Sequence, residues 1–400
     1  MKATVTRIAA GLLTFLIGLG VATFLVVGRR QSTIQPVSID ETSSAPSSTA
    51  LEMVFVLDTT GSMGGLIDGA KQRIWGIVNE VMQQPSHPAV KIGLVAYRDH
   101  GDAYVTQVLP LTNDLDKVYS TLMDYRADGG GDTPEDVRQA LVDGVKRAGW
   151  SEASSRLAQI IFLVGDAPPH QNYTNEPDTL VTAAEAVQKG MIVNTIQCGI
   201  SGETTSVWKA IAQRGQGQYF AIAQDGGVAA ISSPYDEQLG QLATQLGATY
   251  VAYGGGAGAA GEARRRELSS LAAASEAKVA AEAPATAKAD RAINKVVNTE
   301  AAYVGDLLQN IENGSVKLES MKDEDLPADL RKLSPEERKQ EIEKRLAARK
   351  EIRAQIVSLS KQRDEFIAAE RKKSNAGKES GFDAAVASAL KEQLARKGIK

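Results

Sequence analysis

The chain has 400 residues, of which 43% are hydrophobic and 24% are charged, and these ordinary values for a globular protein exclude wholesale disorder. The formal net charge of −4 hides an asymmetry, because residues 32–261 carry roughly 12 net negative charges and residues 262–400 roughly 4 net positive charges. An acidic domain repels phosphate backbones, so nucleic acid is not expected as a partner. Cys198 is the only cysteine, which excludes an internal disulfide and a cysteine-based zinc site and predicts a buried strand residue instead.

Residues 8–28 form an uncharged apolar stretch with basic residues on both sides. A helix of about 20 residues crosses the hydrocarbon core of a bilayer, so we expect an N-terminal membrane anchor over residues 1–30. A cleaved signal peptide is the alternative, with Gly20-Val21-Ala22 as its candidate cleavage site. The expected topology is a single pass with the bulk of the chain extracytoplasmic, in the periplasm. Residues 31–50 are rich in Ser, Thr and Pro and predict a flexible linker.

From residue 51 onward, strand and helix patterns alternate along the chain. Short runs rich in β-branched and aromatic residues predict strands at Leu51–Leu57, Val90–Tyr97, Ala103–Leu109, Gln159–Val164, Met191–Cys198 and Gln218–Ile222. Helical patterns lie at Gly65–Met82, Leu115–Tyr125, Pro134–Ala148, Thr179–Lys189, Thr205–Arg214 and Tyr235–Leu246. We therefore expect a doubly wound α/β domain over residues 51–253 with a mostly parallel six-stranded sheet. The short turn between the second and third strands predicts a hairpin, and hence one antiparallel edge strand.

After residue 253 the composition shifts to Gly and Ala, and then to Glu, Lys, Arg and Ala. We interpret residues 254–284 as a linker and helix, residues 285–373 as a helical hairpin or coiled-coil-like tail, and residues 374–400 as a terminal linker and short helix. Self-association through this α-helical tail is a hypothesis. Residues 256–261 match Gly-x-Gly-x-x-Gly, but no strand precedes them, so a linker is favoured over a dinucleotide site.

Oxygen-bearing side chains follow two of the predicted strands and one loop. Asp58, Thr60 and Ser62 stand at alternate positions after the first strand, and Asp166 follows the fourth. Between them a glycine-rich loop brings Thr133 to the start of the next helix. The carboxyl ends of parallel strands meet at one edge of a sheet, so these side chains are expected to converge. Carboxylate and hydroxyl oxygens suit hard cations, which predicts Mg²⁺ or Mn²⁺, although each residue alone is also explained as a turn or capping residue.

The segment from Leu51 to about Tyr253 resembles a von Willebrand factor A domain. Asp58, Thr60 and Ser62 match the Asp-x-Ser/Thr-x-Ser signature of that family's metal-ion-dependent adhesion site, while Thr133 and Asp166 match its second-loop threonine and third-loop aspartate.

Two further points concern this resemblance. Asp132 is the alternative to Thr133 at the second-loop position. Residues 129–136, Gly-Gly-Gly-Asp-Thr-Pro-Glu-Asp, with Tyr97-Arg98-Asp99 upstream, resemble the branch found beside alpha-type kinases and in bacterial extracytoplasmic proteins.

The resemblance implies a membrane-tethered, cation-dependent protein-binding module, serving adhesion or as a scaffold, whose metal takes an Asp or Glu carboxylate from a protein partner. It implies no catalytic residue and no organic cofactor. An accessory subunit of an ATPase- or kinase-containing assembly, or a metal-dependent hydrolase, is the alternative. Asp99, His100 and Asp102 cluster after a strand and are interpreted as hairpin-turn residues, with a second cation site as the other reading.

Overall fold

The computed structural model describes residues 49–82, 88–131, 133–226, 231–297, 305–373 and 381–399. Contacts divide the chain into Met1–Ala45 and Pro46–Lys400, and all the described residues belong to the second unit. The expected membrane anchor and most of the expected linker lie outside the described residues. Among the helices that are described, none is both long and apolar enough to cross a bilayer.

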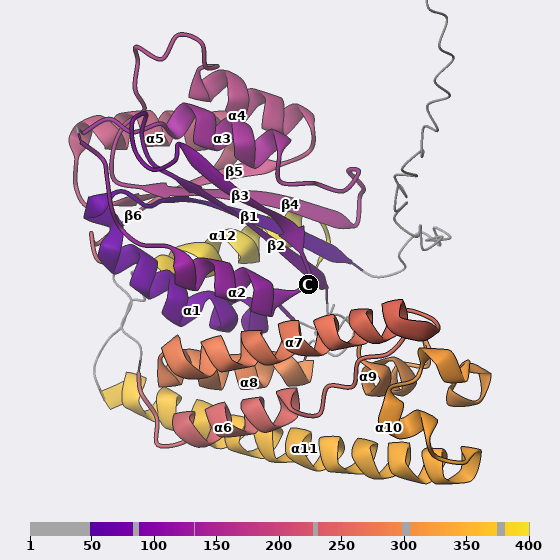
Figure 1. Cartoon of the computed structure of the whole chain (residues 1–400). Helices are drawn as coiled ribbons and strands as arrows, with labels where there is room; N and C mark the ends of the chain where they lie inside the picture. The colour runs from indigo at the N-terminus through magenta and orange to yellow at the C-terminus, as the bar shows by residue number, and fades with distance from the viewer. Residues whose placement is uncertain are drawn as a thin grey trace, which may run out of the picture. The chain divides into compact units, whose positions relative to one another are not determined.

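Six strands form one sheet in the order β3-β2-β1-β4-β5-β6 (Figure 1). All neighbouring strands are parallel except β2 and β3, which are antiparallel at one edge, so the predicted hairpin is confirmed. Cys198 is buried at the end of β5, as predicted. The strands are β1 (Ala50–Asp58), β2 (Ala89–Tyr97), β3 (Thr106–Thr112), β4 (Leu157–Gly165), β5 (Ile192–Cys198) and β6 (Gln216–Ile222).

Helices cover both faces of the sheet (Figure 1). Successive side chains of a strand point to opposite sides, so Met53 and Phe55 of β1 join the core on one face while Val54 and Val56 join the core on the other. The predicted doubly wound α/β fold is therefore confirmed. The face of Val54 is covered by α3 (Val137–Lys146), α4 (Thr179–Gln188) and α5 (Gly202–Arg214), and the opposite face by α1 (Gly64–Met82), α2 (Leu115–Asp124) and α12 (Phe382–Arg396).

The last helix of the chain, α12, completes this α/β layer. Its Phe382 ring lies 5.9 Å from the ring of Phe55 in β1. Asn194 in β5 and Gln393 in α12 are both fully buried, and their side-chain amides exchange hydrogen bonds of 3.1 and 2.6 Å. The sequence interpretation placed residues 374–400 in a terminal segment apart from the α/β domain. Local sequence patterns do not predict contacts between segments as far apart in the chain as β1 or β5 and α12.

The remaining helices pack on α1 and α2 and on one another, so a helical region follows the α/β domain as expected. A capping box starts the longest of these helices, because Ser334 and Glu337 exchange side-chain to backbone hydrogen bonds of 3.0 and 3.3 Å. The helices are α6 (Asp236–Gly247), α7 (Gly258–Glu282), α8 (Ala285–Val297), α9 (Leu307–Glu312), α10 (Ala328–Arg331) and α11 (Pro335–Lys373). Short 3-10 turns occur at Gly61–Met63, Leu318–Ser320 and Asp323–Asp325.

Buried ion pairs join this helical region together. The guanidinium of Arg363 on α11 donates to Asp236 of α6 at 2.7 Å and to Asp290 of α8 at 2.8 Å. Arg349 donates to Asp306 at 2.6 Å, and both side chains are fully buried.

The helical region also shares its core with the α/β domain. Val279 of α7, Ala283 directly after it and Ala287 of α8 belong to the same apolar cluster as Phe55. Asn79 of α1 donates a buried hydrogen bond of 2.7 Å to the carbonyl of Asp290. The sequence interpretation divided the chain after residue 253, whereas these contacts make Pro46–Lys400 one compact unit.

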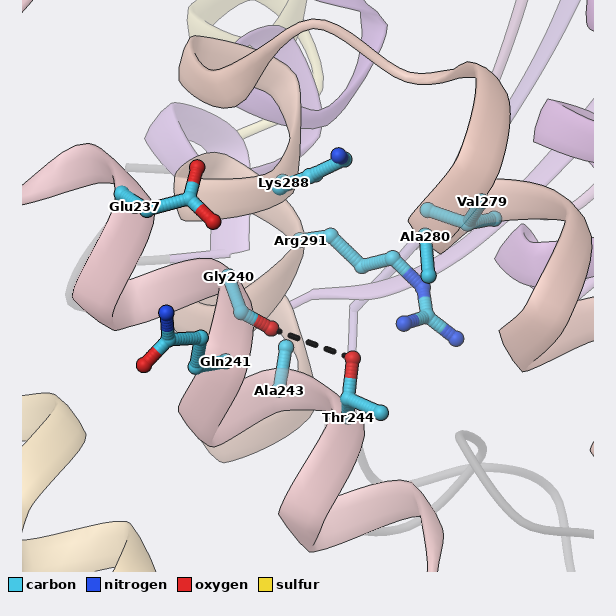
Figure 2. Close-up of a pocket in the computed structure, with 9 residues that line it drawn as sticks. All are labelled: Glu237, Gly240, Gln241, Ala243, Thr244, Val279, Ala280, Lys288 and Arg291. Atoms are coloured by element: carbon cyan, nitrogen blue, oxygen red, sulfur yellow. Dashed lines mark hydrogen bonds between the residues drawn. The ribbon is translucent and has the colours of Figure 1, made fainter.

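A cavity of about 140 Å³ lies between α6, α7 and α8 (Figure 2). The guanidinium of Arg291, which lines this cavity, donates hydrogen bonds to Asp116 and Glu276. The hydroxyl of Thr244 donates to the carbonyl of Gly240 at 3.2 Å. The ion pairs of Arg291 join α8 to α2 and α7, whereas the Thr244 bond lies within α6. This cavity is therefore explained by packing, and the candidate site lies at the edge of the sheet.

Candidate metal centre

Two of the predicted metal ligands lie at the same edge of the sheet. Strands β1 and β4 are parallel neighbours, with Leu57 opposite Val164. Asp58 is the last residue of β1, and Asp166 comes directly after the end of β4. The two carboxylates are therefore brought to the carboxyl ends of adjacent parallel strands, as the strand-end rule for open α/β sheets predicts.

The turn after β1 orients the next two predicted ligands. The backbone N–H and the hydroxyl of Thr60 both donate to Asp58 Oδ1, at 2.9 and 2.7 Å. The 3-10 turn Gly61–Met63 then places the hydroxyl oxygen of Ser62 3.5 Å from that of Thr60. The alternate spacing of the three residues thus gathers one carboxylate and two hydroxyls at one point.

A cavity of about 260 Å³ opens among the loops at this edge. It is lined by Thr60, Gly61, Ser62, Gly129, Gly130, Thr133, Glu135, Asp166 and Ala167. Four of the five predicted ligands therefore line one cavity, and the fifth, Asp58, is hydrogen-bonded to one of them, Thr60. The alternative second-loop residue, Asp132, lies outside the described residues.

Glycine is needed where these loops approach one another. Gly130 has a φ of 74°, and a Cβ there would lie 2.8 Å from both the carboxylate of Glu135 and the Cβ of Thr60. A Cβ at Gly165 would collide with the Tyr97 hydroxyl and lie 3.0 Å from Asp58 Oδ2. The glycine-rich loop therefore has a structural purpose, since it lets the backbone pass close to the carboxylates.

One carboxylate oxygen of Asp58 is buried and accepts no hydrogen bond from the described residues. The side chain is 0% exposed, and its Oδ2 atom has no hydrogen-bond partner. Burial raises the pKa of Asp58 to about 7 against the bonds from Thr60, and the negative charge of Asp166 raises it further. A divalent cation would favour the ionised carboxylate, and the oxygen-only donor set fits Mg²⁺ or Mn²⁺.

Glu135 is a second carboxyl group that lines the cavity, beside Asp166, and it is not among the ligands predicted from the sequence. Its Oε2 atom is buried without a hydrogen-bond partner. Burial raises the pKa of Glu135 to about 9, and the charges of Asp58 and Asp99 add to the effect. Its place two residues after Thr133, in the same loop, is the signal that could have identified it.

Gln224 is a second residue that sequence reasoning missed. This exposed side chain follows β6 and donates a hydrogen bond of 2.6 Å to Asp166 Oδ2. It also lies 3.4 Å from the carbonyl oxygen of Ser62. The loop after β6 therefore reaches the same site as the loops after β1 and β4. No local sequence pattern indicates this contact between loops.

Comparisons with known proteins agree with this fold. Residues 52–233 match the family model described as the von Willebrand factor A domain. The mouse von Willebrand factor A domain-containing protein 7 is 40% identical over 92 residues, which are 23% of this chain and 10% of that protein. A protein of Acanthamoeba polyphaga mimivirus, named as an ariadne-like RING finger protein, is 29% identical over 140 residues, which are 33% of this chain and 13% of that protein.

The chain thus spans only 10% and 13% of the length of these two curated relatives. Among solved structures, BatB from Bacteroides thetaiotaomicron is similar with 15% identity and a TM-score of 0.32, over 44% of this chain and 91% of that one. The SpRpn10 VWA domain has 15% identity and a TM-score of 0.34, over 44% of this chain and 89% of that one.

The chain therefore contains a von Willebrand factor A domain. Such a domain suggests a module for protein interaction or adhesion, and domains of this family commonly bind a divalent metal at their adhesion site.

Proposed function

We propose that this protein is a divalent-cation-dependent protein-binding module whose metal takes an Asp or Glu carboxylate from a partner. Asp58, Thr60, Ser62, Thr133 and Asp166 would hold the cation, Mg²⁺ or Mn²⁺. The observation that carries the proposal is the fully buried Oδ2 atom of Asp58, which has no hydrogen-bond partner among the described residues. The same carboxylate is bonded to Thr60, which lines one cavity together with the other three residues.

Charge explains why such a site would bind a carboxylate. Two aspartates roughly neutralise a divalent ion, while the three hydroxyl groups contribute oxygen without further charge. The bound ion would keep an attraction for one more anionic ligand.

The proposal has two further parts, a membrane tether and self-association. Tethering to a membrane through residues 1–30, with the bulk of the chain in the periplasm, rests on the sequence pattern alone. Self-association through the helical region is supported by the apolar side chains of Leu271 on α7 and Val357 on α11, which are 60% and 56% exposed. The acidic charge of residues 32–261 argues against nucleic acid as a partner.

One observation favours an enzymatic alternative, a metal-dependent hydrolase or a subunit of an ATPase- or kinase-containing assembly. Glu135 places a carboxyl group with a raised pKa at the proposed metal site, and such a group can act as a general base or acid. In a hydrolase, Glu135→Gln would abolish turnover and leave Mg²⁺ binding intact. In a binding module, the same variant would still capture its partner.

Calorimetry with Mg²⁺ on the full chain tests the metal site. We expect one site in the wild type and a loss of affinity of at least about 10-fold in Asp58→Asn and in Asp166→Asn, because each removes a charged ligand. Asp128→Asn is the matched control, since this side chain is 82% exposed in the same loop and does not line the cavity. Equal binding in all four proteins would rule the site out.

Partner capture tests the function itself. Pull-downs with wild type should lose the partner when EDTA is added, and Asp58→Asn should capture none in Mg²⁺. Asp128→Asn should behave as wild type. Capture that resists EDTA and survives Asp58→Asn would contradict a metal-dependent interaction.

A further inference from the structure

A second group of side chains that could bind a metal does not line the cavity of the predicted metal ligands. His100 comes from the loop between β2 and β3, Asp136 from the start of α3, and Glu176 from the segment between β4 and α4. Their ligand atoms all lie within 4.8 Å of one another. His100 Nε2 lies 3.1 Å from Asp136 Oδ2 and 3.0 Å from Glu176 Oε1. Three segments far apart in the chain thus present one imidazole and two carboxylates to one point.

The hydrogen bonds of this group are incomplete. Asp136 is fully buried, and its Oδ1 atom accepts a bond of 2.8 Å from the backbone N–H of Gln139 at the start of α3. Among the described residues its Oδ2 atom has no hydrogen-bond partner, although His100 Nε2 lies 3.1 Å away. The Oε2 atom of Glu176 is also buried and without a partner. Buried carboxylate oxygens without donors are costly unless a cation fills the space between them.

The surroundings hold these side chains in place. The His100 ring packs on Tyr173 at 4.3 Å between centroids. The Tyr173 hydroxyl donates to Asp99 at 2.8 Å. Arg138 Nη1 lies 3.3 and 3.4 Å from the backbone carbonyl oxygens of Tyr173 and Glu176. Packing and hydrogen bonds around a metal ligand set its orientation before the ion binds.

The sequence predicts Asp99, His100 and Asp102 as hairpin-turn residues, with a cation site as the alternative, and the structure separates the three. Asp99 is engaged by Tyr173 and by His170, at 2.8 and 3.2 Å. Asp102 accepts from the backbone N–H groups of Gly130 and Asp99, at 3.0 and 3.2 Å. These two carboxylates therefore stabilise the loops, and of the three residues only His100 joins the second group.

We propose that His100, Asp136 and Glu176 form a second metal site, which binds a divalent first-row transition ion such as Zn²⁺. Nitrogen and oxygen ligands about 2.0–2.2 Å from one ion lie about 3 Å apart, as the His100 nitrogen lies from both carboxylates. An imidazole favours Zn²⁺ over Mg²⁺, whose preferred ligands are oxygens. Three protein ligands leave a further position for water.

Calorimetry of the full chain with Zn²⁺, in buffer with saturating Mg²⁺, tests this proposal because Mg²⁺ occupies the first site. We expect one Zn²⁺ per chain in the wild type. His100→Gln and Glu176→Gln should each weaken Zn²⁺ binding at least about 10-fold. Both variants should keep their Mg²⁺ affinity, which shows that they are folded.

Two controls separate this site from other binding. Glu152→Gln removes an exposed carboxylate elsewhere and should bind Zn²⁺ as wild type does. Asp166→Asn removes a ligand of the first site and should also keep Zn²⁺ binding. Zn²⁺ binding that is absent in the wild type, unchanged in His100→Gln and Glu176→Gln, or lost in Asp166→Asn would overturn the proposal. His100 would then simply pair with the carboxyl groups of Asp136 and Glu176, which would share a proton.

Discussion

Asp58 lies in a buried environment that links the stability of the protein to pH. Its pKa of about 7 in the folded protein lies above the ordinary value of 3.8 expected in the unfolded chain. Between these values the folded state binds more protons than the unfolded state, so the free energy of unfolding falls as pH rises. The stabilising contribution is present at low pH and is lost as pH passes through 7.

This sign gives a test on the metal-free protein. In EDTA, between pH 4.5 and pH 8, wild type should lose on the order of 2–4 kcal/mol more than Asp58→Asn, which cannot ionise at this position. Urea unfolding followed by the fluorescence of the buried Trp75 and Trp208 measures the difference. Mg²⁺ should stabilise wild type at pH 8, by about 2.7 kcal/mol at 100 times its dissociation constant. Parallel pH profiles of the two proteins would contradict the burial argument.

At the scale of elements, α12 covers part of the apolar sheet face on which Phe55 lies. Phe382 is 2% exposed and packs on Phe55, and the backbone N–H of Phe382 donates to the carbonyl of Gly226 at 2.9 Å. Without this helix, part of the apolar face of the sheet would meet water. The C-terminal helix is therefore part of the α/β domain, although a helical region of about 150 residues separates them in the chain.

A single substitution in α12 should show this. Phe382→Ala removes a buried aromatic ring and should lower the free energy of unfolding by about 3–5 kcal/mol. Lys391→Ala, at an exposed position of the same helix, should change it by less than about 0.5 kcal/mol. Thermal and urea unfolding of both variants measure the two effects. Similar small effects in both would mean that α12 is only loosely attached in solution.

At the scale of the whole described unit, Arg363 links three helices. It pairs with Asp236 and Asp290 and is itself buried. Removing one member of a buried ion pair is strongly destabilising, because a buried charge is left without its partner. The packing of α6, α8 and α11 on one another should therefore depend on this cluster.

Limited proteolysis of Arg363→Ala examines this link. Wild type should yield no stable fragment ending near Tyr253, since the helices beyond it share the core of the sheet. Arg363→Ala should lose about 3–5 kcal/mol and become sensitive to cleavage between α6 and α7. Lys361→Ala, exposed two residues earlier, is the matched control. Rapid release of a stable α/β fragment from wild type would show two separable units.

The alternation of strands and helices, the antiparallel edge strand and the resemblance to a von Willebrand factor A domain could all be predicted from the sequence. Each depends on residues close together in the chain, such as the apolar run of β1 and the alternating oxygens of Asp58, Thr60 and Ser62. Hydrophobic periodicity and turn residues predict local conformation, because both depend on neighbouring residues only.

The tertiary structure alone decided which distant segments meet. Packing brought α12 back to the sheet, placed Glu135 at the metal cavity, and assembled His100, Asp136 and Glu176 from three segments. The sequence by itself predicted a cation site at the strand ends, because strand direction and local spacing suffice for that expectation. The second cluster depends on how loops and helices pack, and many apolar contacts fix that packing together, so no short pattern in the sequence records it.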